Sequence, residues 1–418
     1  MISEIRRRKI LVPIFFRGHL ARLRSVFRAI QQHPGLELQI MTASRAPYGS
    51  FLMNLRHSEP RSLWRAMPWY IRAGLASLAG GASGRDTLER KVLGAGFPVH
   101  SRVPLFLDGG TPGVMAKSVG VGLMRIVDEL RRLEPNIVLV SGDRFEMMAI
   151  TIAAAYLNIV IAHHEGGDVS GTIDESVRHA ITKFAHLHLT ATERSRERVL
   201  QMGEDPRFVF NTGSPTIDAF AETDLNPQAG FPQGIDPSLP YLLVLVHPVT
   251  TESDLDNQKT VDSMIDALER LQMPTILVGG NSDAYSRIVG PGLAEWFNLR
   301  RPSYVYAAKL MSPDGYSRVL AHAACAVGNS SSFIREGAWL GTPAVLVGSR
   351  QQGRDRGANA AEVPADAEAI VRSVRKQLAH GRYPRDTRFG EGRAGERIAE
   401  ILATVSPPIQ KKFYDLGL

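Results

Sequence analysis

Three carboxylates in the first half of the chain are placed where acid–base chemistry could occur: Asp143, Glu165 and Glu175. Each follows a short apolar run or begins a helical pattern, and taken singly each is more often a helix cap or a surface charge. Carboxylates that crowd together raise the pKa of one of their number, which can then serve as a general acid or base. If the fold brings these three residues together, we expect acid–base chemistry.

A run of three serines gives a different signal in the second half of the chain. Ser330, Ser331 and Ser332 come one residue after the apolar run 325–328 and precede a helical pattern. Serine hydroxyls and the free backbone N–H groups at the start of a helix bind anions such as a diphosphate. The alternative is an ordinary serine cap, but a cap needs one serine and not three.

A glycine- and arginine-rich segment, 349–357, also follows an apolar run. Within it, Arg350, Gln351, Gly353 and Arg354 could line a phosphate site, because the guanidinium fork matches the geometry of phosphate oxygens. A solvated loop is the alternative interpretation of the same residues.

His247 stands at the end of the apolar run 241–246. A lone histidine is usually structural, but one at a strand end opposite a carboxylate cluster fits an active site better. The sequence has no closely spaced Cys or His ligand set, no Gly-x-Gly-x-x-Gly fingerprint and no Gly-x-Ser-x-Gly motif. We therefore expect no metal and no cofactor.

The elements that must position these residues are short apolar runs alternating with amphipathic stretches. This alternation is typical of α/β folds with parallel sheets covered on both faces, in which ligands bind beyond the carboxyl ends of the strands. We expect strands at residues 10–16, 36–42, 136–141, 158–163, 186–190, 241–246, 274–278, 325–328 and 343–347. We expect helices at residues 117–133, 145–157 and 260–271.

The strand runs form two series, and 418 residues exceed what one hydrophobic core usually holds. The sequence thus predicts two Rossmann-like, doubly wound α/β domains facing a cleft. Residues 1–225 would form the domain with the acid–base carboxylates, and 226–390 the domain with the anion site. The Pro- and Gly-rich stretch 226–240 would join them, and 391–418 would form a helical segment packed on either domain.

The composition excludes several classes of protein. Apolar residues make up 44% and charged residues 22%, which is ordinary for a globular protein. The net charge is +7, but the basic residues are scattered, so we expect no nucleic-acid partner. No run is apolar enough to span a bilayer, and no signal peptide is recognisable. The one cysteine, Cys325, lies in an apolar segment and predicts a buried thiol in a reducing compartment, hence a cytoplasmic protein.

The segment 51–86 fits the α/β pattern poorly, because Trp64, Trp69 and Tyr70 alternate with arginines. A basic, aromatic helix of this kind can lie on a membrane surface. We favour a helical hairpin over the first sheet or a subunit contact, and we do not expect peripheral membrane contact.

Several longer segments together resemble the hydrolysing UDP-N-acetylglucosamine 2-epimerases, including the bacterial sialic-acid pathway enzymes. They occur in the family's order and span residues 136–360: SGDRFEMMAI, HHEGGDVSGTIDESVRHAITK, NTGSPTID, HPVTT, GNSSSFIREG and SRQQGRDRGAN. The resemblance implies the glycosyltransferase-B architecture and a homodimer or homotetramer.

The resemblance also implies a reaction. UDP-N-acetylglucosamine, or a related UDP-acetamido sugar, would lose its C2 proton and UDP to give a glycal. Water would then add to give free N-acetylmannosamine or its analogue, for sialic-acid-like or surface polysaccharide synthesis. Asp143, Glu165, Glu175 and His247 fall on catalytic positions of the family. Residues that fall on substrate-binding positions are Arg17, Arg144, Arg178, Asn281, Asp283, Ser330, Ser331, Glu336, Arg350, Gln351, Gly353 and Arg354.

The chain departs from the family after its first strand, where His19 stands at a usually acidic position. This change leaves open whether the sugar is N-acetylglucosamine or a 4-acetamido-6-deoxy relative. The alternatives to a hydrolysing epimerase are a non-hydrolysing epimerase, a UDP-sugar glycosyltransferase of the same fold, and a non-catalytic nucleotide-sugar-binding protein.

Overall fold

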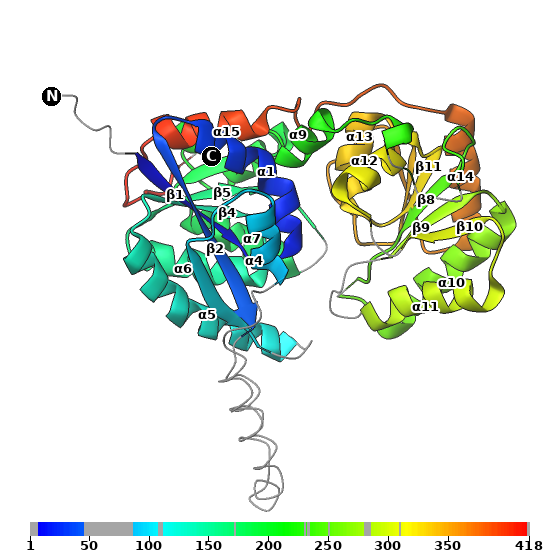
Figure 1. The fold of residues 1–418 in the computed structure, drawn as a ribbon, viewed down its shortest axis with the longest axis horizontal. Coiled ribbons are helices and arrows are strands. Elements are labelled where there is room, and N and C mark those ends of the chain that lie inside the picture. The colour runs from blue at the N-terminus through cyan, green and yellow to red at the C-terminus, as the bar shows by residue number, and fades with distance from the viewer. Residues whose placement is uncertain are drawn as a thin grey trace, which may run out of the picture.

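The computed structural model describes residues 7–45, 87–107, 112–170, 173–229, 231, 235–249, 251–279, 286–308 and 311–415. The expectations for segment 51–86 lie outside these residues. Over the described ranges the chain forms two α/β units, each built on a parallel sheet (Figure 1). No helix in this part of the chain is both long enough and apolar enough to cross a membrane.

The first sheet has seven strands among the described residues, in the order β3-β2-β1-β4-β5-β6-β7. The strands are β1 (Arg8–Ile14), β2 (Leu36–Arg45), β3 (Ser101–Phe106), β4 (Ile137–Ser141), β5 (Val160–His164), β6 (Leu187–Thr190) and β7 (Val209–Asn211). All neighbouring strands pair in parallel. The chain order reverses between β1 and β4, which is where open α/β sheets bind their ligands.

Helices cover both faces of this sheet. The helices of this unit are α1 (Arg17–Gln32), α4 (Thr87–Gly94), α5 (Pro112–Leu133), α6 (Phe145–Tyr156), α7 (Ile173–Phe184) and α8 (Glu193–Gln201). Helix α9 (Pro215–Glu222) follows them and packs on other helices rather than on this sheet. Along β1, Ile10 and Val12 belong to the core under α1, while Leu11 belongs to the core under α5 and α6. A strand buried on both faces explains why its sequence is continuously apolar rather than alternating.

The second sheet has six strands within the described ranges, in the order β10-β9-β8-β11-β12-β13, again all parallel. They are β8 (Leu242–Leu245), β9 (Thr275–Val278), β10 (Val305–Ala308), β11 (Cys325–Gly328), β12 (Ala344–Val347) and β13 (Ala360–Val363). The accompanying helices are α10 (Asp254–Leu271), α11 (Ser286–Arg300), α12 (Pro313–His322), α13 (Arg335–Leu340) and α14 (Ala367–His380). Cys325 is buried in β11, as expected.

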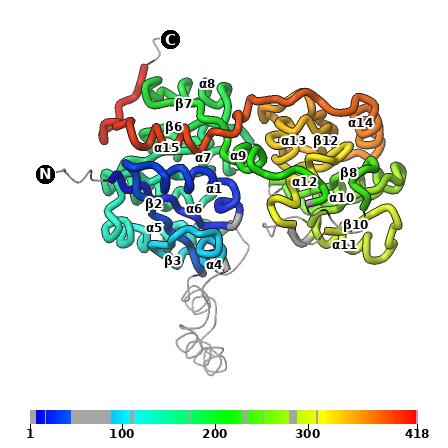
Figure 2. Tube along the Cα trace, turned by 45° about the horizontal axis from the view of Figure 1, so that its top comes forward, coloured from blue at the N-terminus to red at the C-terminus, as the bar shows by residue number. Residues whose placement is uncertain are grey.

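The chain passes between the two units twice (Figure 2). Helix α9 contacts α1 of the first unit and α13 of the second, and Ile217 on α9 lies in the core of the second unit. The final helix, α15 (Ala394–Thr404), returns to the first unit and packs on α1 and α9. Its first backbone N–H groups, from Ala394 and Gly395, donate to the buried carboxylate of Asp218 at 2.9 and 2.7 Å.

The two-domain α/β fold expected from the sequence is confirmed. Every expected strand is present, but four further strands were not expected: β3, β7, β10 and β13, which form the edges of the two sheets. The expected helix at 260–271 begins earlier, at Asp254, because Ser253 and Asp256 form a capping box there. The domain limits at 225 and 390 stay predictions.

Candidate active site

Asp143 lies in the turn between β4 and α6. Gly142 has φ 82°, a conformation that favours glycine, and its carbonyl oxygen lies 3.0 Å from Nε2 of the buried His163. This contact fixes the turn, so that the Asp143 carboxylate meets the guanidinium of Arg178 on α7. Arg178 is itself buried and donates to the Asp168 carbonyl oxygen at 2.7 Å.

Glu165 follows β5 directly and has φ 66°, which is uncommon outside glycine. The turn behind it requires Gly167, where a Cβ atom would lie 2.1 Å from the Ser195 carbonyl oxygen. The Glu165 carboxylate accepts from Arg335 of the second unit, and its other oxygen lies 3.8 Å from Arg22. Burial opposes ionisation, but Arg335 and Arg22 outweigh it and hold the pKa of Glu165 well below its usual range.

Glu175 lies in the first turn of α7 and accepts from the backbone N–H of Ser170. Its other oxygen lies 3.8 Å from Nε2 of His179, and a third of the side chain remains exposed. Arg178, one turn later on α7, reaches the Ser170 hydroxyl at 3.3 Å. The loop ending at Ser170 and the helix α7 therefore hold Glu175 and the Asp143–Arg178 pair at one end of the first sheet.

The expectation that crowding raises a carboxyl pKa in this cluster is wrong for Glu165. Its nearest charges are arginines rather than carboxylates, because Arg335 reaches it from the second unit. A raised pKa occurs instead at Glu336, and burial is its main cause. Within the described part of the chain, one carboxylate oxygen of Glu336, Oε2, has no hydrogen-bond partner.

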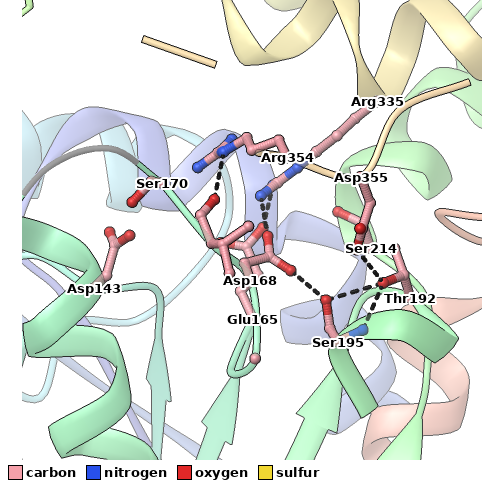
Figure 3. A network of polar contacts seen from close by, with 12 residues as sticks. Asp143, Glu165, Asp168, Ser170, Thr192, Ser195, Ser214, Arg335, Arg354 and Asp355 are labelled. Atoms are coloured by element: carbon pink, nitrogen blue, oxygen red, sulfur yellow. Dashed lines mark hydrogen bonds and ion pairs between the residues drawn. The ribbon is translucent and has the colours of Figure 1, made fainter. Parts of the chain in front are cut away.

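A network of ion pairs joins the two units beside Glu165 (Figure 3). Arg335 also contacts Asp168 at 2.9 Å, and the Ser195 hydroxyl donates to the other oxygen of that carboxylate at 2.7 Å. A second ion pair has its carboxylate on the second unit and its arginine on the first: Asp355 accepts two hydrogen bonds from Arg198, at 2.9 and 3.0 Å.

The arginine-rich segment also takes part in this contact. Arg354 donates from Nε to the Val169 carbonyl oxygen at 3.2 Å. Burial, followed by the repulsion from Arg335, lowers the pKa of Arg354 to about 10. Gly353 precedes it with φ 78°. Arg354 therefore contacts the loop after β5 and does not lie in a solvated loop.

The serine run lies at the end of β11, in a short 3-10 turn (Ser331–Phe333) that leads into α13. The hydroxyls of Ser330 and Ser332 lie 2.8 Å apart, and the Tyr316 hydroxyl lies 2.5 Å from that of Ser332. No long helix begins here, and Ser330 caps the turn, because its hydroxyl accepts from the Ser332 N–H at 3.4 Å. The N–H groups of Phe333 and Ile334 also donate within the turn, so the serine hydroxyls are the groups that could donate to an anion.

Asn329 ties several expected site residues to this turn. Its side chain accepts from the His247 N–H at 2.7 Å and donates to the His247 carbonyl oxygen at 2.8 Å, which joins the ends of β8 and β11. Its own carbonyl oxygen accepts from Arg350 at 2.9 Å and from Gln351 at 2.8 Å. His247, Ser330, Arg350 and Gln351 therefore surround one point of the second unit.

His247 is buried, and its Nδ1 has no hydrogen-bond partner among the residues that the structure describes. Burial, and then the nearby charge of Arg350, lowers the pKa of His247 to about 3, so the imidazole is neutral at pH 7. Like the free oxygen of Glu336, this nitrogen is a buried polar atom without a partner. Such atoms are costly unless a ligand or water satisfies them.

Of the remaining expected residues, the structure describes the side chain of Arg144 but not those of Arg17, Asn281 and Asp283. Arg144 bonds Glu146 at 2.7 Å, and its guanidinium lies 4.9 Å from the centre of the Phe16 ring. Arg17 begins α1. His19 is buried against Phe16, with 3.9 Å between ring centres, and no described residue forms a hydrogen bond with its Nδ1.

The family model for UDP-N-acetylglucosamine 2-epimerase matches residues 82–403, which include all of these contacts between the units. The chain belongs to this epimerase family. The chain is 33% identical over 311 residues to UDP-N,N'-diacetylbacillosamine 2-epimerase (hydrolyzing) of Legionella pneumophila, covering 74% of this chain and 81% of the relative. It is 31% identical over 320 residues to UDP-N-acetylglucosamine 2-epimerase of Neisseria meningitidis serogroup B, covering 75% and 82%.

Two solved structures of epimerases show the same fold as this chain. A UDP-GlcNAc 2-epimerase from Neisseria meningitidis bound to UDP-GlcNAc superposes with a TM-score of 0.71 at 15% identity, covering 94% of this chain and 99% of the other. The Methanocaldococcus jannaschii UDP-GlcNAc 2-epimerase in complex with UDP-GlcNAc and UDP gives 0.68 at 17% identity, with the same coverage.

The contacts between the two units of this chain include residues that sequence reasoning did not select: Asp168, Arg198, Arg335 and Asp355. Ser195, which supports Asp168 from within the first unit, was not selected either. Asp168 and Arg335 stand inside the motifs HHEGGD and FIREG, next to residues that were selected. The signal available was their charge beside a predicted strand end. Their pairing could not be read from the sequence, because 167 residues separate them.

Proposed function

We propose that this chain is a hydrolysing 2-epimerase that converts a UDP-linked acetamido sugar into the free 2-epimeric sugar and UDP. The observation that most supports the proposal is the pairing of Glu165 with Arg335, since it brings the carboxylate end of one unit against the serine turn of the other. A nucleotide sugar bound between the units would have its sugar at the carboxylates and its diphosphate at the serines.

The second unit would hold UDP. The hydroxyls of Ser330 and Ser331 would donate to the diphosphate, and Arg350 would add positive charge beside it. Glu336 would bind a ribose hydroxyl through the oxygen that now has no partner. The neutral His247 would use its free Nδ1 toward the same ligand.

The first unit would carry out the chemistry in two steps. In the first, a carboxylate removes the C2 proton, the bond from C1 to the UDP oxygen breaks, and a C1–C2 double bond forms. In the second, water gives its hydroxyl to C1 while a proton is delivered to C2 from the opposite face. We assign proton removal to Glu165 and proton delivery to Asp143 and Glu175, because proton transfer to and from one carbon needs groups on both sides of it.

Hydrolysis is favoured over return of an intact UDP-sugar by the relatives. The Legionella relative, 33% identical over 311 residues, is named a hydrolyzing enzyme. The same relative acts, by its name, on UDP-N,N'-diacetylbacillosamine, whereas the Neisseria relative acts on UDP-N-acetylglucosamine. We therefore propose UDP-acetamido sugars as the substrate class, for sialic-acid-like or surface polysaccharide synthesis. A cytoplasmic homodimer or homotetramer remains a prediction.

NMR of the products from a panel of UDP-HexNAc sugars, without any acceptor, tests this function. The proposal predicts equimolar UDP and a free 2-epimeric sugar from at least one member. A glycosyltransferase would consume the panel only when an acceptor is added. A nucleotide-sugar-binding protein without activity would leave every member unchanged while still binding it in calorimetry.

A further inference from the structure

Arg335 makes an unusual contact for a residue next to a nucleotide-binding turn, because its guanidinium leaves its own unit. It is the first residue of α13, yet it bonds Glu165 and Asp168, which both belong to the loop after β5 of the first unit (Figure 3). The side chains of Arg335 and Glu165 are 8% and 6% exposed, so water screens the pair little.

This pairing is unfavourable for a catalytic base. A carboxylate removes a proton best when its pKa is near the working pH, and one held far below that pH is a weak base. Burial of Glu165 would raise its pKa, but Arg335 first and Arg22 second reverse the effect. The titratable and charged groups facing Glu165 are Arg22 and His19 on α1, His164 on β5, and Arg335 and Glu336 on α13.

Arg335 is the member of this set best placed to change partner. It follows the serine turn by two residues, so a diphosphate bound there would bring negative charge close to its guanidinium. Asp168 would remain satisfied, because the Ser195 hydroxyl already donates to it. Arg22 cannot replace Arg335, because it lies 3.8 Å from Glu165 and is 40% exposed.

We propose that Arg335 is a positioning residue that keeps Glu165 paired and unreactive until the substrate diphosphate draws its guanidinium away. This inference rests on the proposed function, since it assigns a role to Arg335 in the same reaction. Once Arg335 has moved, Glu165 is a buried carboxylate with one remaining cation, the partly exposed Arg22 at 3.8 Å, and its affinity for a proton rises toward the working range. The enzyme would thus generate its base only when the nucleotide sugar is bound.

The pH dependence of two kinetic constants separates these states. The acid limb of kcat/KM reports the free enzyme, in which Arg335 lowers the pKa of Glu165, and the acid limb of kcat reports the substrate complex. A base must be ionised to act, so each limb falls as the pH drops through the corresponding pKa. The wild type should therefore show its kcat/KM limb at a lower pH than its kcat limb.

The Arg335→Gln substitution should bring the two limbs together. Removing an opposite charge within about 4–6 Å shifts a carboxyl pKa by about 1–3 units, so the kcat/KM limb should rise by about that amount while the kcat limb stays in place. Arg335→Lys keeps the positive charge and should retain most of the wild-type separation. Arg335→Met carries the same prediction as Arg335→Gln.

Two controls isolate this effect. Asp355→Asn weakens the contact between the same two units at Arg198 without touching Glu165, so it should alter KM and leave the separation of the limbs unchanged. Glu336 also has a raised pKa, so the profiles are repeated in a Glu336→Gln background to remove its titration.

Equal limbs in the wild type, or an unchanged separation in Arg335→Gln, would overturn the inference. So would a loss of activity that is the same at every pH, because that result indicates a purely structural role. A similar upward shift in Asp355→Asn would attribute the effect to separation of the units and would also overturn it. Absence of free sugar in the wild-type reaction would instead refute the proposed function.

Discussion

The substitution Asp143→Asn tests the carboxylate cluster with the least disturbance to the fold. It keeps the shape of the side chain but removes the charge that pairs with Arg178. Arg178 keeps two other acceptors, the Asp168 carbonyl oxygen at 2.7 Å and the Ser170 hydroxyl at 3.3 Å. The loop and α7 should therefore remain in place.

The magnitudes follow from this geometry. A hydrogen bond to a charged group contributes about 1.5–3 kcal/mol. Because the Asp143 side chain is 23% exposed and an amide still accepts one hydrogen bond, we expect a stability loss of about 1 kcal/mol. Loss of a positioned acid or base lowers turnover by about 10²–10⁴-fold. The two effects are therefore well separated in size.

The assay measures UDP release at saturating nucleotide sugar, with thermal unfolding of the same samples. Asp266→Asn is the matched control, since Asp266 forms an arginine pair on the surface of α10, where both side chains are 47% exposed. It should leave turnover unchanged. Turnover of Asp143→Asn within tenfold of the wild type would refute the assignment of acid–base chemistry to this residue.

Three further predictions concern the anion site, domain closure and stability. Combining Ser330→Ala with Ser331→Ala should weaken UDP binding by roughly tenfold per hydroxyl. Ser331→Asp should abolish UDP binding, because the new carboxylate repels the diphosphate. If calorimetry shows that Ser331→Asp binds UDP as tightly as the wild type, the diphosphate lies elsewhere. UDP should compact the molecule in small-angle scattering, since the ligand would bind both units; an unchanged radius of gyration at saturation would count against closure. The buried carboxylate of Glu204, which bonds His188 and Lys411, has a pKa lowered to about 2, because these partners and Lys183 outweigh its burial. Glu204→Gln should therefore lower the free energy of unfolding by about 2 kcal/mol at pH 7, which is less than for a fully buried pair because both lysines are partly exposed. This loss of stability should shrink as the pH falls from about 4.5 toward 2, because the wild-type carboxyl group then becomes neutral as well. A loss of stability that does not change with pH in urea unfolding would contradict this.

The fold was predictable where strands are buried on both faces. Strands such as β4, with five buried residues in succession, give a continuous apolar run that the sequence shows directly. Among the described residues, the four edge strands have no neighbouring strand on one side, and their sequences are only partly apolar. In β3 buried and more exposed residues alternate, and it includes Pro104. In β13, Glu362 interrupts the run. Edge strands are therefore the ones that apolar runs fail to predict.

The candidate site was predictable within each unit and not between units. Asp143, Glu165 and Glu175 could be selected because they follow strands whose carboxyl ends meet at one edge of the sheet. The direction in which the pKa of Glu165 is shifted could not be predicted, because its main partner, Arg335, is 170 residues away in the chain. Only the packing of one unit on the other determines which charge a buried carboxylate meets.

The origin of the hydrogen at C2 of the product tests the central proposal most directly. The enzyme is incubated with its preferred UDP-acetamido sugar in D₂O, without an acceptor, and the first product is followed by proton and carbon NMR. The account predicts a free 2-epimeric sugar with one deuterium at C2, together with UDP, because the original proton is lost before solvent supplies its replacement. A product that retains protium at C2, or a 2-epimer still attached to UDP, would contradict it.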